Sequence, residues 1–116
     1  MYKGDLVRFN TDHEKIKHQV DMGKDYFNAL RPSTLEDRET WKNSNTNKEM
    51  NSAGETKLPP MAVWVPLSID GIFIVERARC RAQLGWGNKT PGLAKIIDPE
   101  SGSIAFVKRE MLEVLK

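Results

Sequence analysis

The stretch of sequence that most clearly predicts the fold is Leu93-Ala-Lys-Ile-Ile-Asp-Pro-Glu-Ser-Gly-Ser-Ile-Ala-Phe-Val107. Its two ends, Leu93–Ile97 and Ser103–Val107, are short apolar runs typical of strands. Asp98–Gly102 between them favours a tight turn, because proline presets the first turn dihedral and glycine accepts a positive φ. The stretch therefore predicts an antiparallel β-hairpin.

The residues on either side of this hairpin extend the β pattern. After it, Lys108–Leu112 is expected to form one tight helical turn and Glu113–Leu115 a last short strand. At the N-terminus, Lys3–Phe9 alternates as a first strand. The apolar run Leu58–Leu67 contains prolines, which confine a strand to the edge of a sheet, and Ile69–Gly71 follows it as a turn.

A second strand signal, Ile72–Leu84, carries arginines at alternate positions and leads into the glycine-rich loop Gly85–Gly92. In an extended chain this spacing puts the three guanidinium groups on one face. The opposite face would then hold small apolar side chains that can pack. The arginines are Arg77, Arg79 and Arg81, and the packing face is Ala78, Cys80, Ala82 and Leu84.

The middle of the chain has a helical texture. Thr11 and Glu14 are spaced as a capping box, and apolar residues follow at helical intervals, so we expect a helix over residues 12–30, weakened at Gly23. Ser33, with Glu36 three residues later, predicts a second, short helix to about residue 42. Residues 43–57 are almost entirely polar and are predicted to be a mobile loop.

Length and composition predict one domain that folds around one core, since the chain has 116 residues. The formal net charge is only +2, but eight basic and five acidic side chains lie in residues 71–116, where the strand signals are. A single cysteine and no apolar run of membrane-spanning length predict a cytoplasmic protein that makes no membrane contact.

Both ends of the chain together resemble an SH3-like small β-barrel of the Tudor or KOW kind. The resemblance rests on Lys3–Phe9, which matches the first strand of such barrels, and on Gly92–Val107 with Met111–Leu115 behind it. It implies an α+β fold: a barrel built from residues 1–10 and 60–116, with a largely helical and partly mobile insertion at 11–59. The combination has the general look of a bacteriophage or bacterial accessory protein.

The basic strand predicts a non-enzymatic protein that binds DNA or RNA, because arginine's planar fork can hold two phosphate oxygens. Trp86, between two glycines, could stack on a base. The predicted nucleic-acid-binding residues are Arg77, Arg79, Arg81, Trp86, Lys89, Lys95 and Arg8.

Other interpretations of these residues stay open. The arginines could be a solvated strand face paired with Glu76, Glu100 or Glu113 on neighbouring strands. Trp86 could instead fold back over the barrel mouth. A different class of function, a small module or phage-type inhibitor that docks on a host protein, would use the insertion. Its contact residues would be Tyr26, Phe27 and Trp41.

Patterns for catalysis or metal binding are weak. Glu14 and His18 share a helix face, but a solvated face is the simpler interpretation. Cys80 would be reactive only if exposed, and its side is the packing face. Trp41 and Trp64 are expected to pack in the core or between insertion and barrel. The sequence therefore predicts no enzyme, no cofactor and no metal site, and it does not indicate an oligomeric state.

Overall fold

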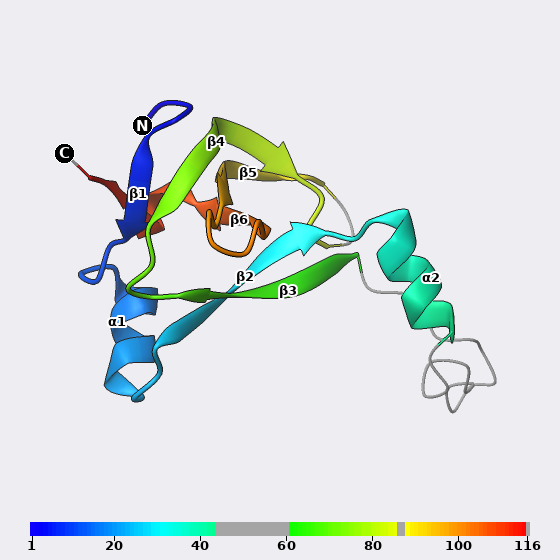
Figure 1. Ribbon diagram of the computed structural model, residues 1–116, viewed down its shortest axis with the longest axis horizontal. Coiled ribbons are helices and arrows are strands. Elements are labelled where there is room, and N and C mark those ends of the chain that lie inside the picture. The colour runs from blue at the N-terminus through cyan, green and yellow to red at the C-terminus, as the bar shows by residue number, and fades with distance from the viewer. Residues whose placement is uncertain (44–60, 86–87, 116) are drawn as a thin grey trace.

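The computed structural model describes residues 1–43, 61–85 and 88–115. Within these ranges the chain forms one antiparallel sheet of seven strands, two short α-helices and a 3₁₀ turn (Figure 1). The elements are β1 (Leu6–Phe9), α1 (Glu14–Asp21), β2 (Tyr26–Pro32), α2 (Leu35–Asn43), β3 (Ala62–Ser68), β4 (Phe73–Ala82), β5 (Thr90–Ile97), β6 (Ile104–Lys108), η2 (Arg109–Met111) and β7 (Leu112–Val114).

The sheet is open, so the predicted closed SH3-like barrel is wrong. Its strand order is β3-β2-β6-β5-β4-β1-β7, which leaves β3 and β7 as edges with one neighbour each. The outer side of β6 is occupied by β2, through the pair Leu30↔Phe106. The inserted segment thus extends the sheet at β6, the strand against which a barrel would have to close.

The insertion is also not largely helical. The helix predicted over 12–30 ends at Asp21, where Gly23 takes a positive φ of 76° and its N–H bonds the carbonyl of Val20. The chain then continues as β2, which pairs along its whole length with β3. The residues of β2 form a strand because of a non-local pairing. Their partner strand starts only at Ala62, and the sequence around β2 does not itself predict a strand.

Both helices begin one or two residues away from the predicted caps. Helix α1 starts after His13, whose Nδ1 accepts a hydrogen bond from the Lys15 backbone N–H at 3.2 Å. Helix α2, which confirms the second predicted helix, is preceded by Thr34. The Thr34 N–H donates to Asp37 Oδ2 at 2.8 Å, and the Asp37 N–H donates to Thr34 Oγ1 at 3.2 Å. This reciprocal pair satisfies two backbone donors at the helix start.

The predictions made from turns are confirmed. Strands β5 and β6 pair as a hairpin, closed by Asp98–Gly102 with Gly102 at a φ of 74°. The turn before β4 is closed by the Gly71 N–H on the Ser68 carbonyl. Strand β3 lies at the sheet edge, as its prolines predict, and η2 is the expected helical turn. The loop predicted over 43–57 lies almost wholly outside the described residues.

Strand β4 departs from simple alternation. Phe73 and Val75 face the core, and Arg77, two residues further, is exposed. The pairing with β5 explains this, since the register shifts between Val75 and Arg77, again between Arg77 and Cys80, and once more before Ala82. Each extra residue in one strand reverses which face the following side chains occupy.

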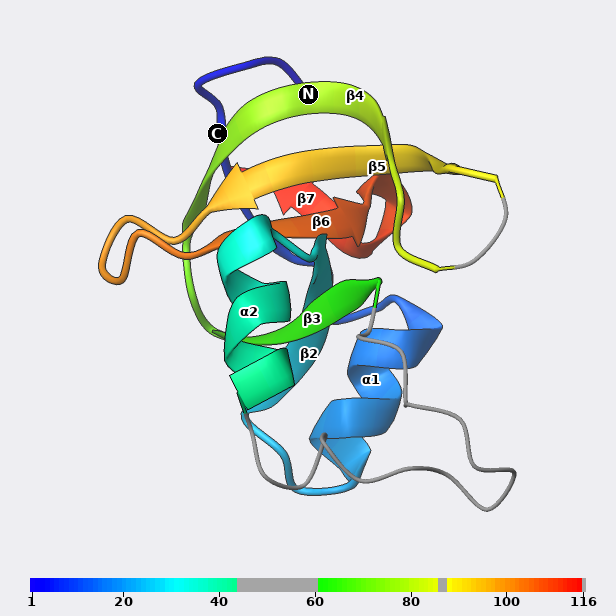
Figure 2. The same cartoon turned by 90° about the vertical axis from the view of Figure 1, so that its right-hand side faces the viewer.

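One hydrophobic core holds the sheet and α1 together. Phe9 lies at its centre, with ring centroids 5.4 Å from Phe27 on β2 and 5.5 Å from Phe73 on β4. Ile16 is the fully buried residue of α1. In Figure 2, β4 arches over β5 and β6, while β2 and β3 cross below them near the two helices. The inserted ribbon therefore packs on the same core as the terminal strands.

Candidate nucleic-acid interface

The three arginines of β4 are all exposed, but the register does not keep them on one face. Arg77 pairs with Lys95 and so lies on the same side of the sheet. Cys80 pairs with Leu93, which is on that same side of β5, so Arg79 and Arg81 point to the other side. The extra residue between Arg77 and Cys80 causes this split. The predicted common face therefore holds only for Arg79 and Arg81.

Arg77 begins a row of side chains that crosses the sheet at right angles to the strands. Direct pairings join Arg77 to Lys95, Lys95 to Phe106, Phe106 to Leu30, and Leu30 to Trp64. Residues directly opposite one another share a sheet face, so all five lie on one side. We call these five residues, which come from β4, β5, β6, β2 and β3, the cross-strand row.

The row combines cations with aromatic surface. Lys95 Nζ lies 6.0 Å from the ring centroid of Phe106 and 3.3 Å from Glu76 Oε1. Arg77 forms no ion pair with any residue that the structure describes. Trp64 is 65% exposed, so the expectation that it packs in the core is wrong. A phosphate and a planar ring could therefore both be held on this face.

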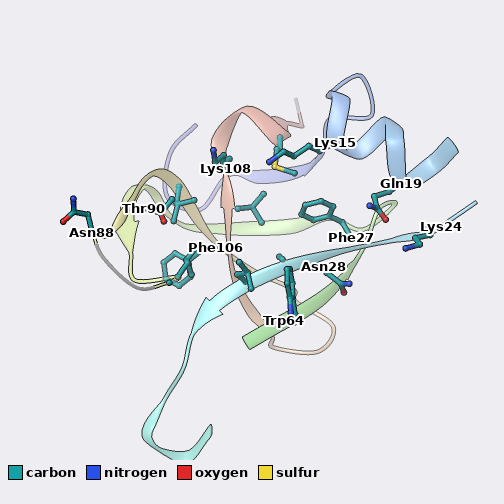
Figure 3. Close-up of a pocket in the computed structure, with 17 residues that line it drawn as sticks. Lys15, Gln19, Lys24, Phe27, Asn28, Trp64, Asn88, Thr90, Phe106 and Lys108 are labelled. Carbon is teal, nitrogen blue, oxygen red and sulfur yellow. The ribbon is translucent and has the colours of Figure 1, made fainter. Parts of the chain in front are cut away.

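Beside the row, a groove of about 670 Å³ opens where β2 separates from β6. The two strands pair only at Leu30↔Phe106, and beyond that point their side chains line a gap that α1 closes at one end. Figure 3 shows Phe27 in the middle of this groove, with Lys108 and Trp64 on opposite sides of it. The lysines of the lining are Lys15, Lys24 and Lys108, and its aromatic residues are Phe27, Trp64 and Phe106.

The groove is electrostatically one-sided. No carboxylate is among the described residues that line it. Lys15 and Lys108 have exposed side chains and no ion pair within the described part of the chain. Lys24 Nζ lies 5.8 Å from the Tyr26 ring centroid and forms no ion pair with a residue that the structure describes. The groove therefore favours an anionic ligand with a flat apolar part.

The remaining predicted binding residues contribute less. Arg8 pairs with Glu113, its Nε lying 2.5 Å from Oε1, so its charge is already matched. Lys89 is exposed just before β5. Trp86 lies outside the described residues, and both interpretations of it stay predictions. Cys80 is half-buried, and burial raises the pKa of its thiol, which disfavours the reactive thiolate.

Sequence reasoning missed the groove because its lining comes from four separate segments. Phe27 falls in the stretch predicted to be a helix, and Lys15, Lys24 and Lys108 belong to no recognisable motif. One signal was available at Trp64, which alternates with Val63 and Val65 in a strand whose next apolar residue, Leu67, is also odd-numbered. That parity puts Trp64 on the face away from the core.

No protein-family model, curated protein or solved structure matches this chain. The family membership suggested by the SH3-like resemblance, and the likeness to a phage accessory protein, therefore stay predictions. Among the residues described, no group of three or more His, Cys, Asp or Glu side chains is placed to hold a metal ion. None of the helices in those same ranges has the length and apolar character needed to cross a membrane.

Proposed function

We propose that this protein binds single-stranded nucleic acid, DNA or RNA, on the sheet face that carries the cross-strand row, and that it acts by binding rather than by catalysis. The row itself supports this proposal best. It places an arginine with no ion pair among the described residues, a lysine and two aromatic rings on one face within five neighbouring strands. A cytoplasmic location, which the single Cys80 favours, belongs to the same proposal.

Phosphate contact is the role of the cations. Arg77 offers a planar fork for two phosphate oxygens, and no described carboxylate competes for it. Lys95 and Lys108 lie on the same side of the sheet. Lys95 is opposite Phe106, and Lys108 is opposite Leu93, which is two residues from Lys95 on β5 and so shares its face. Each neutralised phosphate releases counterions, so binding should weaken as salt rises.

Base contact is the role of the aromatic rings. Trp64 is largely exposed and Phe106 is half-buried, so both offer a ring face to a ligand. Stacking contributes about 1 to 3 kcal/mol per base and tolerates any base. Unpaired bases can reach these rings, whereas paired bases cannot leave their stack without cost. The row spans about 19 Å at roughly 4.8 Å per strand, which is room for several nucleotides.

The test is fluorescence anisotropy with a labelled single-stranded oligonucleotide of mixed sequence and with its duplex. We expect tighter binding of the single strand, and a loss of affinity between about 50 and 200 mM salt. Arg77→Ala should reduce the salt slope by about 0.7, the value for one phosphate on a single strand. Trp64→Ala should weaken binding by about 5- to 100-fold, because a stacked base is lost.

Two matched arginine variants control for bulk charge. Arg38→Ala removes the same charge from the exposed side of α2 and should leave affinity unchanged. The double variant Arg79→Ala/Arg81→Ala removes two charges from β4 itself, but from the other side of the sheet, and should weaken binding less than Arg77→Ala does. Equal losses in all three variants, or no binding of either probe at low salt, would overturn the proposal.

The alternative, a protein-binding surface on the insertion, would have to use its residues in a different arrangement from the helical one predicted. Tyr26 and Phe27 are on a strand and not on a helix, and Phe27 packs on Phe9 in the core. Trp41 is half-buried on α2. A host-protein partner would show itself in a pull-down from lysate that survives nuclease treatment, while a nucleic-acid ligand would not.

A further inference from the structure

We infer that the groove between β2 and β6 is a nucleotide-binding site that accepts one base together with its phosphate. The inference rests on the proposed function, because the nucleotide would come from an unpaired position of a bound nucleic-acid strand. It goes further by assigning a separate subsite, with its own residues, to a single nucleotide. A free nucleotide has the same chemistry, and the experiment below separates the two sources.

The size and position of the groove fit one nucleotide. About 670 Å³ is within the range of small-ligand sites in proteins. The groove shares Leu30, Phe106 and Trp64 with the cross-strand row, so the two sites are continuous. A strand that crosses the row could therefore turn one base into the gap without leaving the protein surface.

The charges of the lining fit a phosphate. Lys15 and Lys108 are exposed at the mouth of the groove and, in the part of the chain that the structure describes, neither is paired with a carboxylate. Because Lys15 is on α1 and Lys108 ends β6, a phosphate held by both would connect the α1 end of the gap to its β6 side.

The apolar floor and the amide groups fit a base. Phe27 lies in the middle of the groove and is supported from behind by Phe9, at 5.4 Å between ring centroids (Figure 3). Gln19 and Asn28 also belong to the lining, Gln19 beside Phe27 towards α1 and Asn28 nearer Trp64. An amide side chain carries both donors and an acceptor, so it can bond the edge of a base. The groove can therefore hold a base by its face and by its edge.

The experiment titrates the full chain, isotope-labelled, with adenosine 5′-monophosphate and uridine 5′-monophosphate and follows backbone amide shifts by NMR. Ribose 5-phosphate and the two nucleosides serve as probes that lack the base or the phosphate. We expect either nucleotide to shift the amides of β2, β6 and α1 at concentrations up to about 10 mM. Each partial probe should bind at least about fivefold more weakly.

Three variants test the residues. Lys15→Gln/Lys108→Gln should weaken nucleotide binding at least about fivefold, since it removes both cations. Lys17→Gln, an exposed lysine of α1 that does not line the groove, is the matched control and should bind as the wild type does. Phe27→Leu keeps an apolar side chain against Phe9, so the fold is retained, but it removes the ring and should weaken binding about fivefold or more.

The outcomes separate this inference from the proposed function. If the oligonucleotide binds, the nucleotides cause no shifts and the lysine variant binds the oligonucleotide as the wild type does, the groove inference is overturned and the proposed function stands. If the nucleotides bind at the groove but no oligonucleotide binds, the groove site is supported and the proposed function is overturned. If neither probe binds, both are overturned. Nucleotide shifts that Lys17→Gln weakens as much as the lysine pair does would also overturn the groove assignment.

Discussion

The two parts of the sheet are held together in different ways. The terminal strands form a continuous ladder in which β5 pairs with β6 from Leu93↔Lys108 to Ile97↔Ile104. The inserted ribbon of β2 and β3 is well paired internally, yet it joins the rest of the sheet through the single pair Leu30↔Phe106. The groove is therefore a product of missing pairing, because it opens where the ladder between β2 and β6 stops.

Side-chain packing compensates for the thin backbone connection. Phe9 on β1 contacts Phe27 of the ribbon and Phe73 of the terminal strands, so one buried ring touches both parts. The ribbon also contributes Ala29, Val65 and other residues to the common core. The junction is therefore apolar contact to a much larger extent than hydrogen bonding.

Removing this shared ring is expected to have the largest effect. Phe9 is 1% exposed, so Phe9→Ala should lower the free energy of unfolding by about 3 to 5 kcal/mol. Urea denaturation followed by circular dichroism measures the change. Leu35→Ala, at a side chain that is 74% exposed on α2, is the control and should change stability by less than about 0.5 kcal/mol. A small effect at Phe9 would show that the two parts do not depend on the same core.

The densely paired part has its own weak point at Gly92. This glycine lies in the irregular stretch of β5 opposite Cys80 and Ala82 and has a φ of 73°. A Cβ atom at this position would meet no neighbouring atom within 4 Å, but the positive φ is unfavourable for any residue with a side chain. Gly92→Ala should therefore lower the free energy of unfolding by about 1 to 2 kcal/mol. Gly85→Ala meets neither a positive φ nor a neighbouring atom within 4 Å, and thermal melts should show it to be much closer to neutral.

Hydrogen exchange tests the difference between the two parts directly. If the ribbon opens without the rest of the sheet, the amides of β2 and β3 should exchange at least about tenfold faster than those of β5 and β6, or about 1.4 kcal/mol in opening free energy. The measurement is native-state exchange followed by NMR. Equal protection in all four strands would mean that the sheet opens as one unit.

The hydrogen bonds at the start of α2 contribute a smaller, local amount to the stability of the inserted part of the chain. Thr34 accepts from and donates to Asp37, so Thr34→Ala should cost about 1 kcal/mol of helix stability. Thr34→Ser keeps the hydroxyl and serves as the control. If the alanine and serine variants melt at the same temperature, the cap is not a stabilising contact.

The smallest expected effect is the pH dependence of the same cap. The hydrogen bond from Arg31, and then that from the Thr34 backbone N–H, hold the pKa of Asp37 well below its usual range. A lowered pKa in the folded state stabilises the protein above the pKa of the unfolded chain, about 3.9, and this contribution is lost as pH falls. The melting temperatures of the wild type and Asp37→Asn should therefore differ at pH 5, and the difference should shrink progressively as pH falls below about 3.9 towards the lowered pKa of the folded protein. A difference in melting temperature that does not change with pH would show that the Asp37 carboxylate is not the source of the stabilisation.

The sequence predicts well what short-range chemistry decides. The β5–β6 hairpin follows from Pro99 and Gly102 in its turn, and the edge position of β3 follows from its prolines. The start of α2 was missed by one residue because Ser33–Glu36 and Thr34–Asp37 offer the same spacing, and only the observed hydrogen bonds choose between them. Local rules thus give elements more reliably than they give their boundaries.

What the sequence could not provide is the long-range pairing. Phe27 and Leu30 are three apart, which fits a helix, and β2 is a strand only because β3 returns to pair with it. The groove depends on a further non-local fact, namely that β2 and β6 meet at one pair only. The lysines and Phe27 of the groove are far apart in the sequence and form no motif, so their common site could not be predicted before the fold was known.

The first of the extra residues in β4, Glu76, affects how this chain can change in length. Phe73, Val75 and Arg77 are spaced two apart, so an unbroken strand would turn all three inward and bury an unpaired guanidinium. Glu76 prevents this by adding a residue that β5 does not match. A chain shortened by one residue at Glu76 would keep Phe73 and Val75 inside and Arg77 outside without the register shift between Val75 and Arg77. Deletion at this position should therefore be better tolerated than replacement of the buried Phe73 or Val75 by alanine.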